Sequence, residues 1–190
     1  MTSQDAGYVV GLGNPGRRYR RTRHNLGFEV VELLADRWQA PSPRRTFAGR
    51  LWQGDFAGRP VRLLAPETYM NDSGRSVAEM VRFYKVDPAQ LLIVLDDMAL
   101  EPGSVRLRAR GSAGGHNGLA DVLDVLGTRE VARLRLGIGE PPPGMDGVDY
   151  VLGKITDAER AAADEAIETA CRVVEDWLTE GTEAAMNRHN

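Results

Sequence analysis

Two histidines, one aspartate and three asparagines stand in polar segments of this sequence and could form one reactive site. They are His24, His116, Asp96, Asn14, Asn71 and Asn117. An imidazole with a pKa near ~6.5 can take a proton from water at neutral pH, and a neighbouring carboxylate can hold it in one tautomer. Asparagine side chains can donate hydrogen bonds to a developing oxyanion. These residue types predict hydrolysis by activated water. An ester suits such a site better than an amide because it has the better leaving group.

Other chemistries lack the residues that they need. The sequence contains neither H-E-x-x-H nor G-x-S-x-G, the signatures of zinc proteases and of one large class of serine hydrolases. His24 and His116 have no evident third ligand, so we predict no metal site and no cofactor. Cys171 is the only cysteine, which excludes an intrachain disulfide. It lies beside the apolar face of a predicted helix, so we expect it to pack in the core.

A glycine-rich segment, Gly11–Gly16 (GLGNPG), matches the dinucleotide-binding pattern G-x-G-x-x-G. That interpretation also needs a helix that opens on the loop and an acidic residue at the end of the next strand. The residues that follow, RRYRRTRHN, have no apolar stripe, and Glu32 and Asp36 lie in a predicted helix. We therefore discount a nicotinamide-dependent oxidoreductase and interpret the glycines as a tight turn. This leaves Asn14 unexplained.

Short apolar runs alternate with helical stripes along the chain. Five runs predict strands, at Tyr8–Leu12, Pro60–Leu64, Leu91–Leu95, Val105–Leu107 and Leu134–Ile138. A weaker candidate, Arg45–Phe56, could pair with Pro60–Leu64 across Ala57-Gly58-Arg59. Apolar residues at helical spacing predict helices over residues 28–38, 77–84, 119–126 and 156–181. Thr156 and Glu159 form a T-x-x-E capping box at the start of the last one.

This alternation predicts an α/β fold. We expect a single domain over residues 1–190, with a twisted, mixed and largely parallel central sheet flanked by helices. In such sheets ligands bind beyond the carboxyl ends of the strands. The segments that carry the candidate residues are predicted to lie there: Gly13–Asn25, Thr68–Gly74, Asp96–Asp97 and Gly111–Gly118.

Composition indicates the class of protein. The chain has 190 residues, of which 42% are hydrophobic and 27% charged, which is typical of one globular core. No apolar stretch is long enough to predict a transmembrane helix, and the segment MTSQDAGYVVGLGN does not resemble a secretory signal. We therefore expect a cytoplasmic protein with no membrane partner.

The net charge of −3 hides an uneven distribution. Residues 1–139 carry 20 basic and 15 acidic side chains, whereas residues 140–183 carry 3 and 12. Arginine, which binds phosphate better than lysine, accounts for 22 of the 24 basic residues. Five of the seven residues from Arg17 to Arg23 are arginine. This cluster indicates either a solvated face or the approach of an anion.

Five segments resemble the bacterial peptidyl-tRNA hydrolase family, in the family's order and spacing and over essentially the whole chain. They are VGLGNPGRRYRRTRHNLGF from Val10, PETYMNDSGRSV from Pro66, DDMALEPG from Asp96, GSAGGHNGL from Gly111 and RLRLGIG from Arg133. Together these motifs are far more specific than any one of them. Ala99 departs from the pattern, because relatives often carry an acidic residue there.

The resemblance implies an enzyme that cleaves the ester between a peptide and the 3′ end of tRNA and recycles tRNA in translation and ribosome rescue. It implies His24 as the general base, Asp96 as the residue that holds and polarises it, and Asn14 as the reader of the blocked amino group. Other implied contacts to peptide, nucleotide or oxyanion come from Asn71, His116 and Asn117, with Tyr19, Tyr69 and Met70 lining the cleft. Arg108 and Arg135 match positions that clamp a phosphate of the acceptor stem. The family also implies a monomer.

Several assignments keep a second interpretation. Asn71 could be only the cap of the following helix, Asp97 rivals Asp96, and His116 could be helix-cap scaffolding. The whole chain could also be an RNA-binding module that hydrolyses nothing, although such a module has no need of the His24 and Asp96 pair. His189 is expected to be solvated.

Overall fold

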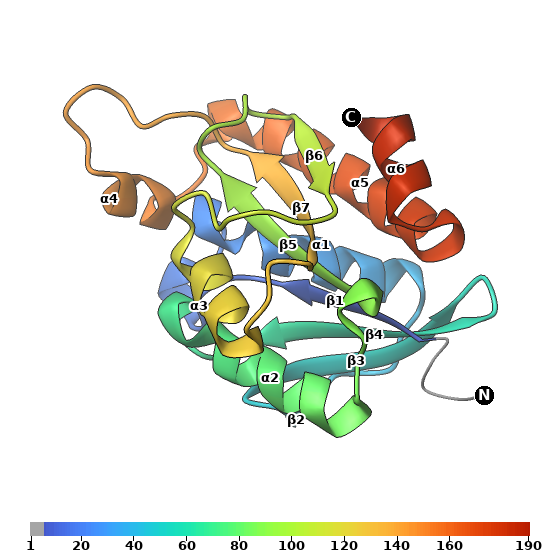
Figure 1. The fold of residues 1–190 in the computed structure, drawn as a ribbon. Helices are drawn as coiled ribbons and strands as arrows, with labels where there is room; N and C mark the ends of the chain where they lie inside the picture. Colours follow the sequence, from blue (N-terminus) through green and yellow to red (C-terminus); the bar gives the residue numbers. More distant parts are fainter. Residues whose placement is uncertain (1–5) are drawn as a thin grey trace.

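Seven strands form one twisted sheet in the order β2-β3-β4-β1-β5-β7-β6 (Figure 1). This computed structural model describes residues 6–190, so the first five residues of the predicted domain lie outside the described residues. The strands are β1 (Gly7–Gly11), β2 (Arg44–Thr46), β3 (Gly49–Phe56), β4 (Arg59–Pro66), β5 (Leu91–Asp97), β6 (Val105–Arg108) and β7 (Ala132–Gly137). The central pairs β4–β1, β1–β5 and β5–β7 are parallel, and the pairs at both edges are antiparallel. The predicted mixed α/β sheet is confirmed.

The hairpin predicted between residues 45 and 64 is confirmed, with a shorter loop than expected. Phe56 pairs with Arg59, so Ala57 and Gly58 alone form the turn. Both have positive φ, 52° and 78°, which is the geometry that lets a two-residue turn follow the twist of the strands.

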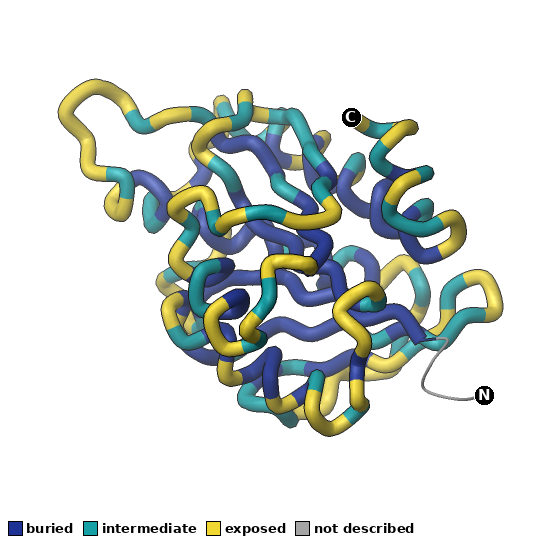
Figure 2. Tube along the Cα trace, viewed as in Figure 1, coloured by how far each residue is buried: buried dark blue, intermediate teal, exposed yellow. Residues whose placement is uncertain are grey.

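Helices cover both faces of the sheet. They are α1 (Leu26–Arg37), α2 (Ser73–Tyr84), α3 (Asn117–Leu126), α4 (Gly147–Leu152), α5 (Asp157–Glu180) and α6 (Thr182–His189), with short 3-10 turns η2 (Arg17–Tyr19), η3 (Arg23–Asn25), η4 (Met70–Asp72) and η5 (Pro88–Gln90). Val9 of β1 packs in the core with α1 and α5, whereas its neighbours Tyr8 and Val10 pack with α2 and α3. Because successive side chains of a strand point to opposite faces, β1 contributes to both cores, and Figure 2 shows the central strands as buried.

The ends of α5 are as the sequence predicts. The backbone N–H of Thr156 donates to Glu159 Oε2 at 2.8 Å, which forms the capping box. Gly181 ends the helix with a φ of 87°. None of the described helices is long and apolar enough to cross a lipid bilayer.

Two helices, α4 and α6, are not predicted from the sequence. The expectation that His189 is solvated is wrong, because its Nε2 lies 2.7 Å from Asp176 Oδ2 and ties α6 to α5. The side chain of Asn190 bonds both backbone groups of Leu107 in the edge strand β6, its Oδ1 at 2.9 Å from the nitrogen and its Nδ2 at 2.8 Å from the oxygen.

Candidate active site

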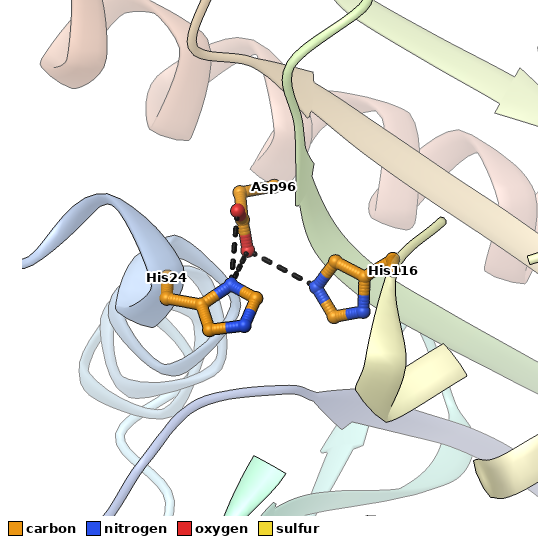
Figure 3. Close-up of side chains that lie close together, drawn as sticks. All are labelled: His24, Asp96 and His116. Carbon is orange, nitrogen blue, oxygen red and sulfur yellow. Dashed lines mark hydrogen bonds and ion pairs between the residues drawn. The ribbon is translucent and has the colours of Figure 1, made fainter. Parts of the chain in front are cut away.

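Three side chains from distant parts of the sequence meet at the carboxyl end of β5 (Figure 3). His24 lies in η3 and Asp96 lies in β5, whereas His116 is the residue that caps the start of α3. His24 Nδ1 lies 2.9 and 3.0 Å from the two carboxylate oxygens of Asp96, and His116 Nε2 lies 3.2 Å from Oδ1. Asp96 is 2% exposed. Asp97 points elsewhere, and its carboxylate accepts from Arg135.

Close backbone packing brings His24 and Asp96 together. A Cβ on Gly27, in the first turn of α1, would lie 2.5 Å from both Leu12 N and Val94 O. Only glycine therefore lets α1 begin directly against β1 and β5. Since η3 runs into α1 and Asp96 follows Val94 by two residues, this close packing holds the imidazole over the carboxylate.

The hydrogen bonds assign a different role to each ring nitrogen. The N–H of Leu119 donates to His116 Nδ1 at 3.2 Å, so the proton of a neutral His116 sits on Nε2 and is donated to Asp96. His24 likewise donates from Nδ1 to Asp96. His24 Nε2 then keeps its lone pair, and none of the described residues is hydrogen-bonded to it. His24 has the arrangement of a base, whereas His116 both caps α3 and holds Asp96.

Opposing effects act on the pKa of the Asp96 carboxyl. Burial disfavours its charged form, but the neighbouring His24 and His116 favour that form more strongly. The two histidines therefore hold the pKa of Asp96 well below its ordinary value despite its burial. The side chain is thus a carboxylate at neutral pH, as the hydrogen bonds from both imidazoles require.

The expectation that the two histidines have no third ligand near them is wrong. One ligand atom each of His24, Asp96 and His116 lies within 4.8 Å of the others. A metal there would need bare lone pairs on the two nitrogens that now face Asp96. For His116 this would move the proton to Nδ1, where it would oppose the N–H of Leu119 and break the cap of α3. The donor set therefore favours the hydrogen-bonded arrangement over a metal centre.

Asn14 is held by a network that includes Asn25, a residue that the sequence reasoning did not single out. Asn14 N donates to Asn25 Oδ1 at 2.8 Å, and Asn25 Nδ2 donates to Asn14 O at 3.0 Å. Asn14 Oδ1 accepts from Met70 N at 2.8 Å. These bonds fix the amide so that its Nδ2 is the group left to donate. The adjacency of Asn25 to His24 was the only signal in the sequence.

The remaining candidates divide between the main cleft and its surroundings. A cleft of about 670 Å³ is lined by His24, Asp96, His116 and Asn117, and α4 forms one wall. Asn71 is exposed in η4, and the residue that caps α2 is Asp72, so the interpretation of Asn71 as that cap is wrong. Tyr69 is 59% exposed, Met70 is buried, and Tyr19 lies half-buried under the Arg18 guanidinium.

The two predicted phosphate ligands line a separate basic cavity of about 210 Å³. Arg108 and Arg135 lie there with Arg110 and Arg133. Arg135 donates to Asp97, and Arg133 donates to the backbone oxygens of Val131 and Ser112. This cavity shares Asp97 and Gly114 with the main cleft.

Arg23 joins η3 to two other elements, which sequence reasoning missed. Its guanidinium bonds both carboxylate oxygens of Glu159 at 2.7 Å, donates to Tyr150 O and stacks 4.2 Å from the Tyr150 ring. The residue beside His24 is thus fastened to α4 and to the start of α5. Cys171, by contrast, is buried, and burial raises the pKa of its thiol to about 12. This confirms it as a packing residue.

Comparison with known proteins points to one family. A family model described as peptidyl-tRNA hydrolase matches residues 8–190. The peptidyl-tRNA hydrolase of Synechococcus sp. (strain JA-3-3Ab) is 49% identical over 183 residues, 96% of this chain and 81% of that protein. That of Symbiobacterium thermophilum is 49% identical over 185 residues, 96% of this chain and 97% of that protein. The crystal structure of peptidyl-tRNA hydrolase from Acinetobacter baumannii superposes with a TM-score of 0.92 at 40% identity, covering 98% of this chain and 95% of that one.

Proposed function

The chain belongs to the peptidyl-tRNA hydrolase family, and from that premise we propose that it hydrolyses peptidyl-tRNA with water activated by His24. The observation that carries this proposal is the buried pair of His24 and Asp96, in which Nδ1 faces the carboxylate at 2.9 Å and Nε2 remains available to a water molecule. A carboxylate in this position fixes the tautomer that a general base needs.

In the proposed reaction, water attacks the ester carbonyl carbon while His24 Nε2 takes its proton. The resulting imidazolium is stabilised by the charge of Asp96, which His116 holds in place from the other side. When the tetrahedral intermediate collapses, the C–O bond to the ribose breaks, and His24 returns the proton to the departing hydroxyl. The base, the carboxylate and water therefore complete the cycle, and no covalent bond forms between the protein and the acyl group.

Neutral amides are proposed to bind the acyl part of the substrate. Asn14 Nδ2 would donate to the carbonyl of the first peptide bond, which an unblocked aminoacyl group does not have. Asn117, at the N-terminal end of α3, would donate to the developing oxyanion, and Asn71 to the peptide backbone or the terminal nucleotide. Tyr69 would stack on an exposed base of the single-stranded 3′ end, with Met70 and Tyr19 completing the walls.

The basic cavity is proposed to bind the acceptor stem. Arg108 and Arg135 would contact a phosphate there, so substrate affinity should fall as salt rises. We further propose that the protein acts as a monomer in the cytoplasm, where tRNA is charged and used, and that its role is to free tRNA for reuse.

One assay tests this function directly. The release of an N-acetylated amino acid from charged tRNA is followed with and without a chelator. We expect the same rate in both. Binding of the charged tRNA without any release would instead indicate an RNA-binding module that hydrolyses nothing. Loss of activity in the presence of the chelator would indicate a metal at His24, Asp96 and His116.

A further inference from the structure

A further groove, with a basic lining, includes Asn14, which does not line the main cleft. It has a volume of about 700 Å³, and its lining includes Asn14, Asn25, Arg17, Arg20 and Arg21. It shares no lining residue with either the main cleft or the basic cavity. We propose that this groove receives the peptide part of peptidyl-tRNA and that it favours acidic side chains in that peptide. The proposal rests on the proposed function.

Five arginines line the groove, and three of them supply its free charge, because Arg45 and Arg50 pair with carboxylates of the lining. Its three carboxylates already have basic partners, because Glu29 pairs with Arg160 at 2.7 Å, Glu32 with Arg50 at 2.7 Å, and Glu67 with Arg50 at 3.3 Å. Arg17, Arg20 and Arg21 are exposed, and none of them forms an ion pair with a described residue. Their charge is free to meet an anion that enters the groove.

The order of the sites along the sheet indicates which part of the substrate reaches this groove. The basic cavity lies at β6 and β7, and the His24–Asp96 pair lies at β5. The groove lies at β2 and β3 and at the segments that follow β1 and β4. If the RNA lies in the basic cavity and its ester at His24, the acyl group extends past Asn14. The chain beyond the first peptide bond then enters the groove.

The mixed lining of the groove suits a peptide better than a phosphate backbone. Three carboxylates stand among its arginines, whereas the basic cavity has four arginines and one carboxylate, Asp97. Glu29, Glu32 and Glu67 offset part of the positive charge of the lining, so a polyanion gains less there than in the basic cavity. Single acidic side chains can instead reach individual arginines, and basic side chains are disfavoured there.

Peptide length decides whether the arginines are reached. The Cα atom of Arg17 lies within about 11 Å of that of Asn14, because only three residues of at most ~3.6 Å each separate them. An extended peptide spans this distance with its third or fourth residue from the ester. An N-acetylated amino acid is too short, so its hydrolysis should not depend on these arginines.

The test compares four substrates on the same tRNA. One carries an N-acetylated amino acid, and three carry N-acetylated tetrapeptides with the same two residues next to the ester and with Glu, Gln or Lys at the two outer positions. We expect kcat/KM for the Glu peptide to exceed that for the Gln peptide by about three- to tenfold, the effect of one or two exposed ion pairs, and the Lys peptide to be the poorest.

The variant that carries Arg17→Gln, Arg20→Gln and Arg21→Gln should lose this preference and still hydrolyse the N-acetylated amino acid ester at the original rate. A matched control carries Arg82→Gln, Lys85→Gln and Arg172→Gln, which remove the same charge from exposed positions that line none of these cavities. The control should keep the preference. Thermal unfolding of both variants checks that they fold.

Three results would overturn the proposal. They are equal rates for all tetrapeptides in the unaltered protein, a preference that survives in the variant, and an equal loss on every substrate with a weaker salt dependence. The last result would assign the groove to RNA. Failure of the proposed function is distinct, because then none of the four substrates would be cleaved.

Discussion

His24 and His116 carry the same imidazole ring, yet their hydrogen bonds give them unlike chemistry. His116 uses both nitrogens, one for the N–H of Leu119 and one for Asp96, whereas His24 uses only Nδ1. A ring with both nitrogens occupied cannot take a proton from water without breaking a hydrogen bond. This difference supports the proposed role of His24 as the base.

Replacing His24 by alanine should lower kcat by about 10²- to 10⁴-fold, the usual contribution of a general base, and leave tRNA binding intact. Single-turnover hydrolysis and a filter-binding titration measure the two effects. His189→Ala is the matched control, since it removes another histidine that bonds an aspartate, 2.7 Å away. Full turnover in the His24 variant would refute the assignment.

Replacing Asn14 by aspartate should weaken recognition of N-blocked substrates. One carboxylate oxygen can still accept from Met70 N, but the Nδ2 donor becomes an acceptor that repels the peptide carbonyl. We expect kcat/KM for N-acetylaminoacyl-tRNA to fall by about tenfold or more. The ratio of this value to that for unblocked aminoacyl-tRNA is the measurement, and an unchanged ratio would contradict the role of Asn14.

Among the elements, α1 depends on its close approach to β1 and β5 at Gly27. Changing Gly27 to alanine should destabilise the protein by about 1–3 kcal/mol, the usual cost of overpacking, because the added Cβ meets backbone atoms 2.5 Å away. Urea unfolding measures the change. Gly54→Ala is the control, since its Cβ would meet only Ala40 at 3.5 Å. Equal stability of the two variants would show that α1 can move away.

The contact between η3 and α5 should make the stability of the protein depend on pH through Glu159. The carboxylate is desolvated, but its bonds with Arg23 and Thr156 lower its pKa overall. A lowered folded-state pKa gives stability that is present above the unfolded-state pKa of ~4.3 and is lost as pH falls through the folded-state value. Glu159→Gln should therefore be less stable than the unaltered protein at pH 7, with a difference that vanishes in acid.

Unfolding by urea at a series of pH values measures this difference. Glutamine can still accept from Thr156 N in the capping box, so the variant isolates the charge. Glu165→Gln, at an exposed position of the same helix, is the matched control. A difference that is constant down to acid would exclude the ion pair as its source.

Prediction from the sequence succeeded where a signal is local. The alternation of apolar runs indicated the strands around the site, and Thr156 and Glu159 marked the start of α5. The short helix α4 has no apolar stripe long enough to reveal it. The ion pair of Arg23 with Glu159 joins residues 136 positions apart, and the hydrogen bond of His116 to Asp96 depends on how α3 packs. Such interactions exist only once the sheet has formed.

Across the whole molecule, charge should govern how the RNA binds. Arg108→Ala should raise KM for peptidyl-tRNA and reduce the slope of log affinity against log salt by about 0.9 for each phosphate that the variant no longer binds. A short nucleotide-ester substrate, which does not reach the basic cavity, should be cleaved as before. Arg172→Ala, on α5 and away from the cavities, is the control. Equal losses on both substrates would contradict a remote phosphate site.

The amide of Asn190 gives Leu107 the two hydrogen bonds that a further strand would otherwise supply. At the opposite margin β2 has only three residues, two of which are the exposed Arg44 and Arg45. Asn190 thus covers part of the β6 margin, which leaves a second copy of this protein fewer backbone groups there with which to pair strand by strand. Removing the Asn190 carboxamide exposes both backbone groups of Leu107 in β6. Such a protein should precipitate at concentrations that the intact one tolerates.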